Sequence, residues 1–470
     1  MKYKITDFSI LWRITTACNN RCKHCYIYDR ATYGKEKKNE LNVDTFIKIL
    51  DSVCEFEKKY GAVIGRYDIT GGDPLLKEGW KFFITELRKR NKEVNILGNP
   101  DTLTDENIKF LSDAGVRTFQ MSLDGMEHIH DSIRGKGSFR LTVDKISKLK
   151  EYGIHSNINF TLSHMNKHEI FQVIDFVSEQ TVARGMSFDI MSPVGNMEGL
   201  MISQAEVIEI FTEFIEKKKK LIESGNPFIL GERTPFYNLI RFEHNDYFPL
   251  SSEEIPVITG CRAGWAITYI CSDGSVMACW RFPLIAGKMP EQSFEDVFLG
   301  SEELRKFRRP EYYEQCGICD FYLSCRGCPA IACKFSGSPF GENPLCFRDK
   351  IKRETEENSK ILRDVPLNTT YEEEYDFIAS SLYHSSRERF IELMDDEEAL
   401  KTIITLYSDR KALERYMKNP VQYFSEESLS VDDTKKVLIN FFMFKLLHKT
   451  STHVGRSIID KLSRKYLLAV

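Results

Sequence analysis

The stretch FSILWRITTACNNRCKHC, residues 8–25, joins a strand-like run to three closely spaced cysteines. Residues 8–15 are rich in the β-branched and aromatic side chains that strands favour. Directly after them, Cys18, Cys22 and Cys25 supply three thiols within one short loop. Such a loop can place three sulfurs on one metal centre, so the stretch predicts a strand that ends at a metal site.

Further strand-like runs follow along the chain, and amphipathic helical patterns separate them. The predicted strands cover residues 8–15, 66–70, 94–97, 118–123, 155–162 and 187–191. The predicted helices between them cover residues 43–58, 79–90, 104–114, 140–152 and 167–179. Strands that alternate with helices predict a parallel sheet with right-handed crossovers. Because a closed barrel needs about eight such units, the expected fold class is α/β, with an open, partial (β/α)6 TIM-like barrel whose chemistry lies at the C-terminal ends of its strands.

The remainder of the chain divides by composition. We expect the barrel to occupy residues 1–225, ending with a helix near 203–222, and an irregular connection to occupy residues 226–258. A cysteine-rich domain, residues 259–350, follows, held by metal rather than by a large apolar core. Residues 351–470 form a C-terminal α-helical extension, with helices predicted near 371–394, 397–417, 432–448 and 455–467.

Composition limits the partners and the compartment. The formal net charge of −4 over 470 residues gives no reason to expect nucleic acid or a membrane as a partner. The longest apolar run, residues 437–447, is too short to span a bilayer. No signal peptide precedes residue 8, so we expect a cytoplasmic protein whose thirteen cysteines are not disulfides. Cys54 alone lies outside the two cysteine groups, on a helix face, and is interpreted as a core residue.

The three-cysteine loop behind a first strand resembles the radical S-adenosylmethionine (SAM) superfamily. The resemblance implies that Cys18, Cys22 and Cys25 hold a 4Fe–4S cluster whose open iron binds SAM. It also implies that SAM is cleaved reductively to a 5′-deoxyadenosyl radical that abstracts hydrogen. His24 is a candidate fourth ligand, although an aromatic packing role in the loop is the simpler interpretation.

Motifs behind the later strands follow the order in which this family contacts SAM. Gly71, Gly72, Asp73 and Pro74 resemble its Gly-Gly-Glu-Pro motif, with aspartate in place of glutamate, although a plain turn fits these residues equally well. The other SAM contacts implied by the resemblance are Asn99, Ser122, Asp124 and Arg134. Ser122 and Asp124 are two residues apart, so both can point from one strand face toward a ligand. Arg134 would bind the SAM carboxylate through two parallel hydrogen bonds.

The later cysteines resemble the SPASM domain, an extension of radical SAM enzymes that carries two auxiliary 4Fe–4S clusters. By that resemblance the outer cluster is held by Cys316, Cys319, Cys325 and Cys346, and the inner one by Cys261, Cys279 and Cys328. Cys271 or Cys333 could complete the inner set, or one iron could stay open. The pair Cys316 and Cys319 would also suit zinc.

SPASM-bearing enzymes mostly act on peptides or proteins, and this chain looks most like the peptide maturases. We therefore expect it to modify a ribosomally made precursor peptide oxidatively, forming a thioether or another cross-link. A flavodoxin- or ferredoxin-type reductant would supply electrons, and no catalytic base is assigned. Three alternatives remain: a sulfatase-type protein maturase, an enzyme acting on a small molecule such as a haem precursor, and a non-catalytic iron–sulfur electron carrier. Trp280 stands where sulfatase maturases place an aspartate base, which disfavours the first.

Overall fold

The computed structural model describes residues 8–29, 33–60, 64, 66–194, 197–243, 260–282, 284–319, 321–322 and 325–351. The helices predicted beyond residue 351 and most of the predicted connection lie outside these residues.

The centre of the fold is a curled ten-stranded sheet, in the order β10-β9-β8-β1-β2-β3-β4-β5-β6-β7. From β8 to β7 every neighbouring pair is parallel, while β9 and β10 run antiparallel at one edge. The strands are β1 Ser9–Thr15, β2 Arg66–Gly71, β3 Val94–Leu97, β4 Thr118–Ser122, β5 His155–Leu162, β6 Gly185–Ile190, β7 Ile229–Glu232, β8 Ile267–Ile270, β9 Ser275–Met277 and β10 Ile285–Lys288. The six predicted strands are present, and the sheet is open because its order ends at β10 and β7.

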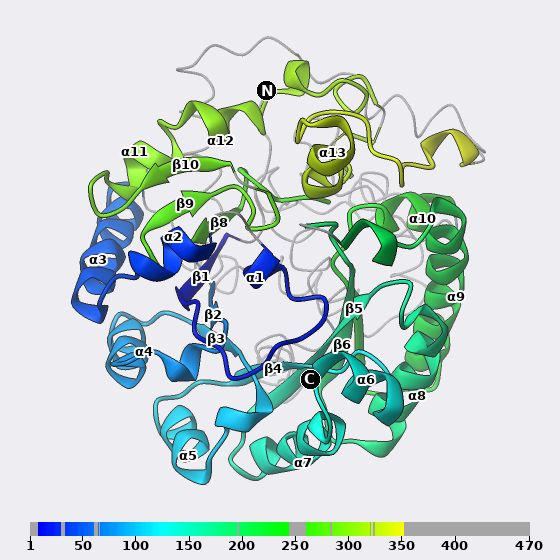
Figure 1. The fold of residues 1–470 in the computed structure, drawn as a ribbon, viewed down its shortest axis with the longest axis horizontal. Helices are drawn as coiled ribbons and strands as arrows, with labels where there is room; N and C mark the ends of the chain where they lie inside the picture. The colour runs from blue at the N-terminus through cyan, green and yellow to red at the C-terminus, as the bar shows by residue number, and fades with distance from the viewer. Residues whose placement is uncertain are drawn as a thin grey trace, which may run out of the picture.

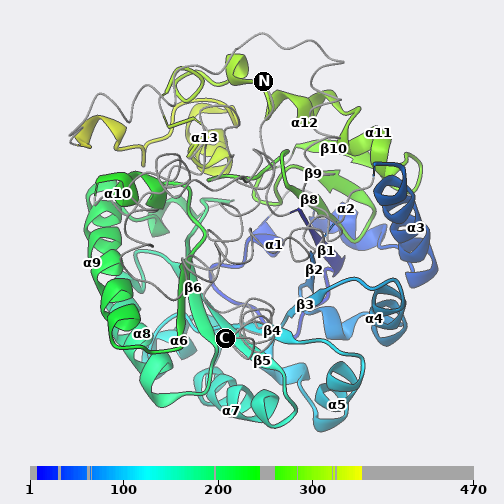
Figure 2. The same cartoon turned by 180° about the vertical axis from the view of Figure 1, so that it is seen from behind.

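Most helices lie on the outside of this sheet, whereas the short α1 lies near the middle of the ring (Figures 1 and 2). Those of the barrel are α1 Tyr26–Asp29, α2 Tyr33–Lys38, α3 Val43–Tyr60, α4 Trp80–Lys89, α5 Asp105–Asp113, α6 Glu127–Arg134, α7 Ser138–Glu151, α8 Ile170–Gln180, α9 Gln204–Glu223 and α10 Tyr237–Glu243. The cysteine-rich region adds α11 Phe294–Phe298, α12 Glu302–Lys306 and α13 Pro329–Ser336. None of the described helices is long and apolar enough to cross a membrane.

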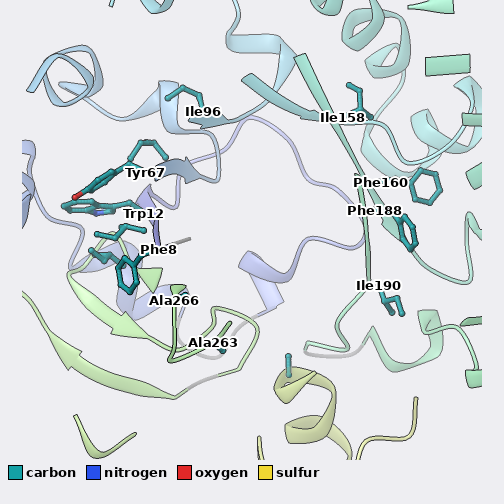
Figure 3. Close-up of a cluster of buried hydrophobic side chains, with 14 of the residues drawn as sticks. Phe8, Trp12, Tyr67, Ile96, Ile158, Phe160, Phe188, Ile190, Ala263 and Ala266 are labelled. Carbon is teal, nitrogen blue, oxygen red and sulfur yellow. The ribbon is translucent and has the colours of Figure 1, made fainter. Parts of the chain in front are cut away.

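The two faces of the sheet differ in chemistry. On the outer face, Trp12 lies 5.5 Å from Phe46 of α3 and 5.0 Å from Phe83 of α4, between ring centroids. Across the barrel, Phe188 packs 4.8 Å from Phe214 of α9. Figure 3 shows Trp12, Phe160 and Phe188 turned away from the middle of the ring. The alternate residues of β4 and β5 are only half-buried and face inward, so the strands enclose a polar interior.

The barrel differs from the prediction at both edges. Residues 226–243, expected within an irregular connection, contain β7, which pairs with β6, and helix α10. At the opposite edge, β8 of the cysteine-rich region pairs in parallel with β1, placing Ser9 opposite Ile267. Each of these two strands is defined by its pairing with a neighbouring strand, β6 for β7 and β1 for β8, which the sequence of the segment itself does not show. The cysteine-rich region is therefore a continuation of the barrel sheet.

Candidate active site and cluster-binding cysteines

The first cysteine loop begins where β1 ends, and Glu40 anchors it there. The carboxylate of Glu40 accepts from the backbone N–H of Thr16 at 2.6 Å and from the Thr15 hydroxyl at 3.1 Å. Lys77 pairs with the same carboxylate at 3.3 Å. Sequence reasoning missed Glu40, because nothing in its local pattern marks a contact with a loop more than twenty residues earlier. The loop thus leaves the strand in a fixed direction.

Hydrogen-bond donors from remote segments lie beside two of the three thiols of this loop, Cys18 and Cys22. Asn99, after β3, donates its side-chain amide to Cys18 Sγ at 3.2 Å. Arg134, the last residue of α6, places Nη1 3.7 Å from Cys22 Sγ. Burial raises the pKa of Cys22, and the charge of Arg134 opposes that rise. Donors and positive charge stabilise thiolate sulfur, so three thiols in this setting fit an iron–sulfur cluster.

The two glycines after β2 pack directly against the cysteine loop. A Cβ atom on Gly72 would lie 2.3 Å from the carbonyl oxygen of Ala17 and 2.7 Å from Cβ of Cys18. A Cβ on Gly71 would lie 2.7 Å from the carbonyl oxygen of Thr15. The Gly72 N–H also donates to that Thr15 carbonyl at 2.9 Å. These positions require glycine because two backbones touch there.

Asp73, the third residue of that motif, is fully buried and supports its neighbours. Its carboxylate accepts from the Thr102 hydroxyl at 2.8 Å and from the backbone N–H of Asn99 at 3.3 Å. It also caps the short 3-10 helix Pro74–Leu76 by accepting from Leu75 N at 3.0 Å. Asp73 therefore fixes the loop that carries Asn99, and its side chain faces no open space.

Asp124 corrects the expectation that it points at a ligand from the strand. β4 ends at Ser122, and Asp124 beyond it is fully buried, with 0% of its surface exposed. Its carboxylate accepts from Arg134 Nε, and from the backbone N–H of Thr161 at 2.7 Å. Burial alone would raise the pKa of Asp124, but Arg134 and His24 hold it well below its usual range. Because protein donors occupy both oxygens, Asp124 positions other residues, while Ser122 stays half-buried at the strand end.

The contact of His24 with Asp124 bears on whether His24 is a fourth cluster ligand or a packed aromatic residue of the loop. Its Nε2 lies 3.0 Å from Asp124 Oδ2, and the ring is buried. His24 is therefore bound to Asp124 in the protein interior rather than turned toward the three thiols as a fourth ligand.

Cys261, Cys279 and Cys328 form a second group, near the inner face of the barrel. Burial raises the pKa of both Cys279 and Cys328 to about 11, and the charge of Arg281 opposes this rise. Arg281 is ion-paired with Asp189 of β6, so the group is tied to the barrel wall. Sequence reasoning gave no sign that Arg281 and Asp189, which are 92 residues apart, form a pair.

Cys271 and Cys333, the two candidates for a fourth ligand of the inner group, have other neighbours in the structure. The thiol of Cys271 accepts from Arg13 Nη2 at 3.1 Å and lies 3.8 Å from the Met277 sulfur. Cys333 lies on α13. Burial raises the pKa of its thiol, and among the described residues no charged group or other thiol contributes to that rise. Chain spacing alone could not separate these cysteines from the ligands, because the turn from β8 to β9 decides where Cys271 points.

Cys316, Cys319, Cys325 and Cys346 line a single pocket. Burial, followed by the neighbouring thiols Cys319 and Cys346, raises the pKa of Cys316 to about 12. Arg326 and Arg348 line the same pocket. Within the described ranges, no three His, Cys, Asp or Glu groups converge on one point as ligands of a single ion would. Four thiols spread around a pocket suit a multi-iron cluster better than tetrahedral zinc.

A buried arginine connects the barrel to the cysteine-rich region. Arg13, inside β1, donates to both carboxylate oxygens of Glu36 on α2, at 2.6 and 2.8 Å. Its guanidinium lies 5.0 Å from the centre of the Trp280 ring, next to Cys279. Glu36 in turn accepts from the Ser272 hydroxyl at 3.0 Å. The one sequence signal for this network was a charged residue inside an otherwise apolar strand.

Comparisons with known proteins agree with this geometry. Residues 12–177 match the model of the Radical SAM superfamily, and residues 261–320 match SPASM, an iron-sulfur cluster-binding domain. The AdoMet-dependent heme synthase of Nitratidesulfovibrio vulgaris is 28% identical over 352 residues, covering 72% of this chain and 91% of that protein. The sporulation killing factor maturation protein SkfB of Bacillus subtilis is 27% identical, and the match covers 61% of this chain and 63% of SkfB. The crystal structure of Streptococcus suis SuiB shares the fold, with a TM-score of 0.57 and 16% identity, over 73% of this chain and 77% of SuiB.

Proposed function

We propose that this chain, which carries a radical SAM domain and a SPASM domain, is an enzyme that oxidatively modifies a peptide. When bound, the catalytic 4Fe–4S cluster and SAM supply a 5′-deoxyadenosyl radical that takes hydrogen from the substrate. Cys18, Cys22 and Cys25 would hold that cluster, since remote donors surround this loop. The residues that would contact SAM are Gly71, Gly72, Pro74, Asn99, Ser122 and Arg134.

Within this site Arg134 is held ready for an anionic group. Its Nε donates to the Asp124 carboxylate, and this bond fixes the plane of the guanidinium. The Nη1 atom then faces the cysteine loop, near Cys22. A guanidinium so fixed can bind a carboxylate through two parallel hydrogen bonds. Asp124 and Asp73 act as positioning residues for Arg134 and Asn99.

The polar lining of the barrel interior is the observation that carries the peptide proposal. Between the cysteine loop and the inner thiols, the inward face presents amides and hydroxyls, which are Asn95, Gln120, Ser122, Asn157, Asn159, Thr161 and Ser187. Such groups can donate to and accept from a peptide backbone, whose own N–H and C=O groups need partners once they leave water. A flat macrocycle would instead need broad apolar walls. SkfB, by its name a maturation protein, lends the proposal further support.

The two auxiliary thiol groups suit an oxidative outcome. A substrate that has lost a hydrogen atom must lose one more electron to form a new bond. Cys261, Cys279 and Cys328 would hold the inner cluster and Cys316, Cys319, Cys325 and Cys346 the outer one, giving that electron a way out of the barrel. An external flavodoxin- or ferredoxin-type protein would exchange electrons with these clusters.

A haem precursor is the second candidate substrate. Its support is the match to the AdoMet-dependent heme synthase, which extends over 91% of that protein. Arg233, which lies beside the ion-paired Arg66 and Arg281, could receive a propionate group.

One experiment separates the two candidates. The anaerobically reconstituted holoenzyme is given SAM, dithionite and either a precursor peptide from the same genomic neighbourhood or Fe-coproporphyrin III. The peptide proposal expects 5′-deoxyadenosine together with a peptide that has lost two hydrogens per modification, measured by mass spectrometry. Decarboxylated porphyrin with an unchanged peptide would overturn it in favour of the second candidate.

A further inference from the structure

Arg233 occupies an unusual place at the end of β7. Its backbone N–H donates to the Phe188 carbonyl at 3.0 Å, which continues the pairing of β7 with β6. Its guanidinium donates through Nη2 to the side-chain oxygen of Gln120 on β4. The side chain therefore crosses the barrel interior from one wall toward another. It keeps solvent access there, since Arg233 is exposed.

Around Arg233 the guanidinium groups outnumber the carboxylates that the structure pairs with them. The charges that act most strongly on Arg233 are those of Asp189, Asp68, Arg66 and Arg281. Arg66 pairs with Asp68 at 3.1 Å, and Arg281 pairs with Asp189. Each aspartate also has a second partner: Asn95 donates to Asp68 at 2.9 Å, and the Thr234 hydroxyl lies 3.4 Å from Asp189.

Three guanidinium groups thus face two carboxylates, and Arg233 is the one left without an anion. Among the residues that the structure describes, it has Gln120 as a neutral partner and no ion pair. Because Arg233 keeps solvent access, a ligand can reach its guanidinium, and a ligand carboxylate would supply the anion that it lacks. The free edge of a guanidinium is also the group that binds a carboxylate in two parallel bonds.

We propose that Arg233, seated on Gln120, is a substrate-anchoring residue that binds a carboxylate inside the barrel. The inference rests on the proposed function and adds a specificity to it: the peptide carries an acidic side chain or its own C-terminus near the modified residue. A propionate offers the same chemistry, so the test includes both sources. Asp189 and Asp68 keep the other two arginines occupied, which directs the incoming anion to Arg233.

The test measures binding to anaerobic holoenzyme by equilibrium dialysis. The peptide probes are two pools of random-sequence peptides that share one fixed position, Glu in one pool and Gln in the other. The porphyrin probes are coproporphyrin III and its tetramethyl ester. We expect an acidic probe to bind at least about tenfold more tightly than its neutral partner, and Arg233→Gln to remove that preference.

Matched variants make the result specific. Arg233→Lys keeps the charge but loses the paired N–H donors of the guanidinium, so it should retain only part of the preference for acidic probes. Gln120→Glu leaves Arg233 in place and gives it an internal carboxylate, which should compete with the ligand and also abolish the preference. Arg140→Gln, a change of an exposed arginine on α7, should leave every affinity unchanged. Iron content and circular dichroism report whether each variant is folded.

The outcomes separate the two proposals. A preference for the Glu pool that disappears with both Arg233→Gln and Gln120→Glu supports both. A preference confined to coproporphyrin III, lost in the same variants, supports the anion site and overturns the peptide substrate. Acidic and neutral probes binding equally, or a preference that survives in Arg233→Gln, overturns the anion site while leaving peptide modification to its own assay.

Discussion

The first cysteine loop and the outer cysteine pocket hold their thiols in different ways. The loop thiols receive donors from distant segments, Asn99 after β3 and Arg134 at the end of α6. The outer thiols of residues 316–346 surround one pocket and act mainly on one another, which with burial raises the pKa of Cys316 to about 12. A four-thiol site completes its own ligand set, whereas a three-thiol site depends on remote residues to orient whatever fills the open position.

Deleting one thiol from each region tests that difference most strongly. Cys22→Ala should abolish 5′-deoxyadenosine formation, because the three-thiol set has no spare ligand. Cys346→Ala should lower the iron content but leave SAM cleavage measurable, since the outer pocket is remote from SAM. Both are measured by iron analysis and chromatography of the nucleoside. Equal loss of SAM cleavage in the two variants would contradict the division.

Removing the charge of Asp124 should break the remote support of the loop. Asp124→Asn leaves Arg134 buried without its anion, so we expect the free energy of unfolding to fall by about 3 kcal/mol or more. SAM affinity should weaken as well, because Arg134 is no longer held. Asp113→Asn, which breaks an exposed pair with Lys109, should change stability by less than about 1 kcal/mol in the same urea titrations. Similar midpoints for both variants would disprove the positioning role.

A methyl group on Gly72 should push the cysteine loop away from its place. Because its Cβ would lie 2.3 Å from the Ala17 carbonyl oxygen, Gly72→Ala should cost about 1–3 kcal/mol and reduce loading of the catalytic cluster. Gly34→Ala is the matched control, since a Cβ on Gly34 would meet nothing within 4 Å. Electron paramagnetic resonance of the reduced proteins reports the loading. Full loading in Gly72→Ala would show that the close approach is dispensable.

The buried imidazole of His130 should give the loop support a pH dependence. Its Nδ1 accepts from the Asp124 N–H at 3.0 Å, and burial lowers the pKa of His130 to about 4. The unfolded chain, with a histidine pKa of about 6.5, binds a proton that the native state does not, so stability falls as the pH drops from about 6.5 toward 4. His130→Asn supplies an acceptor that does not titrate and should flatten this slope in urea midpoints. The exposed His128→Asn should not, and an unchanged slope in His130→Asn would contradict the assignment.

The smallest effect should come from the cysteines that the structure separates from the inner group. Cys271→Ser keeps a small polar group beside Arg13, and Cys333→Ser changes a half-buried helix position. Neither should change the iron content, because the inner group would hold its cluster through Cys261, Cys279 and Cys328. Loss of iron in either variant would restore that cysteine as a ligand.

Strand positions were predictable wherever alternation was long enough to read. Residues 155–162 alternate buried and half-buried side chains, and β5 has those bounds. The four-residue β3 was also predicted, whereas β7 and β8, of the same length, were not. Helix α6 buries only His130 and Ile133, so its apolar face is too small to mark a helix. Their existence depends on neighbouring strands and helices rather than on local preference.

The residues of the candidate site also differ in how far the sequence predicts them. Cys18, Cys22 and Cys25 lie so close in the chain that their common loop could be predicted from the sequence. The inner and outer thiol sets were implied by the resemblance to the SPASM domain, and as ligand sets they stay predictions. Contacts such as Glu40 with Thr16 and Arg281 with Asp189 join residues far apart, and only packing brings them together. Asp124 was misjudged for a related reason: a two-residue interval predicts one face only while the strand continues, and β4 stops at Ser122.

The pairing of β1 with β8 also has a consequence for biosynthesis. β1 leaves the ribosome long before the partner for one of its edges, Ile267–Ile270, which is made more than 250 residues later. Until then the strand that leads into the catalytic loop exposes unpaired backbone groups, a state prone to association with other nascent chains. Arg13 likewise has no Cys271 to bind before that point. We therefore expect the catalytic loop to reach its final form, and to accept its iron, only after the cysteine-rich region has been translated.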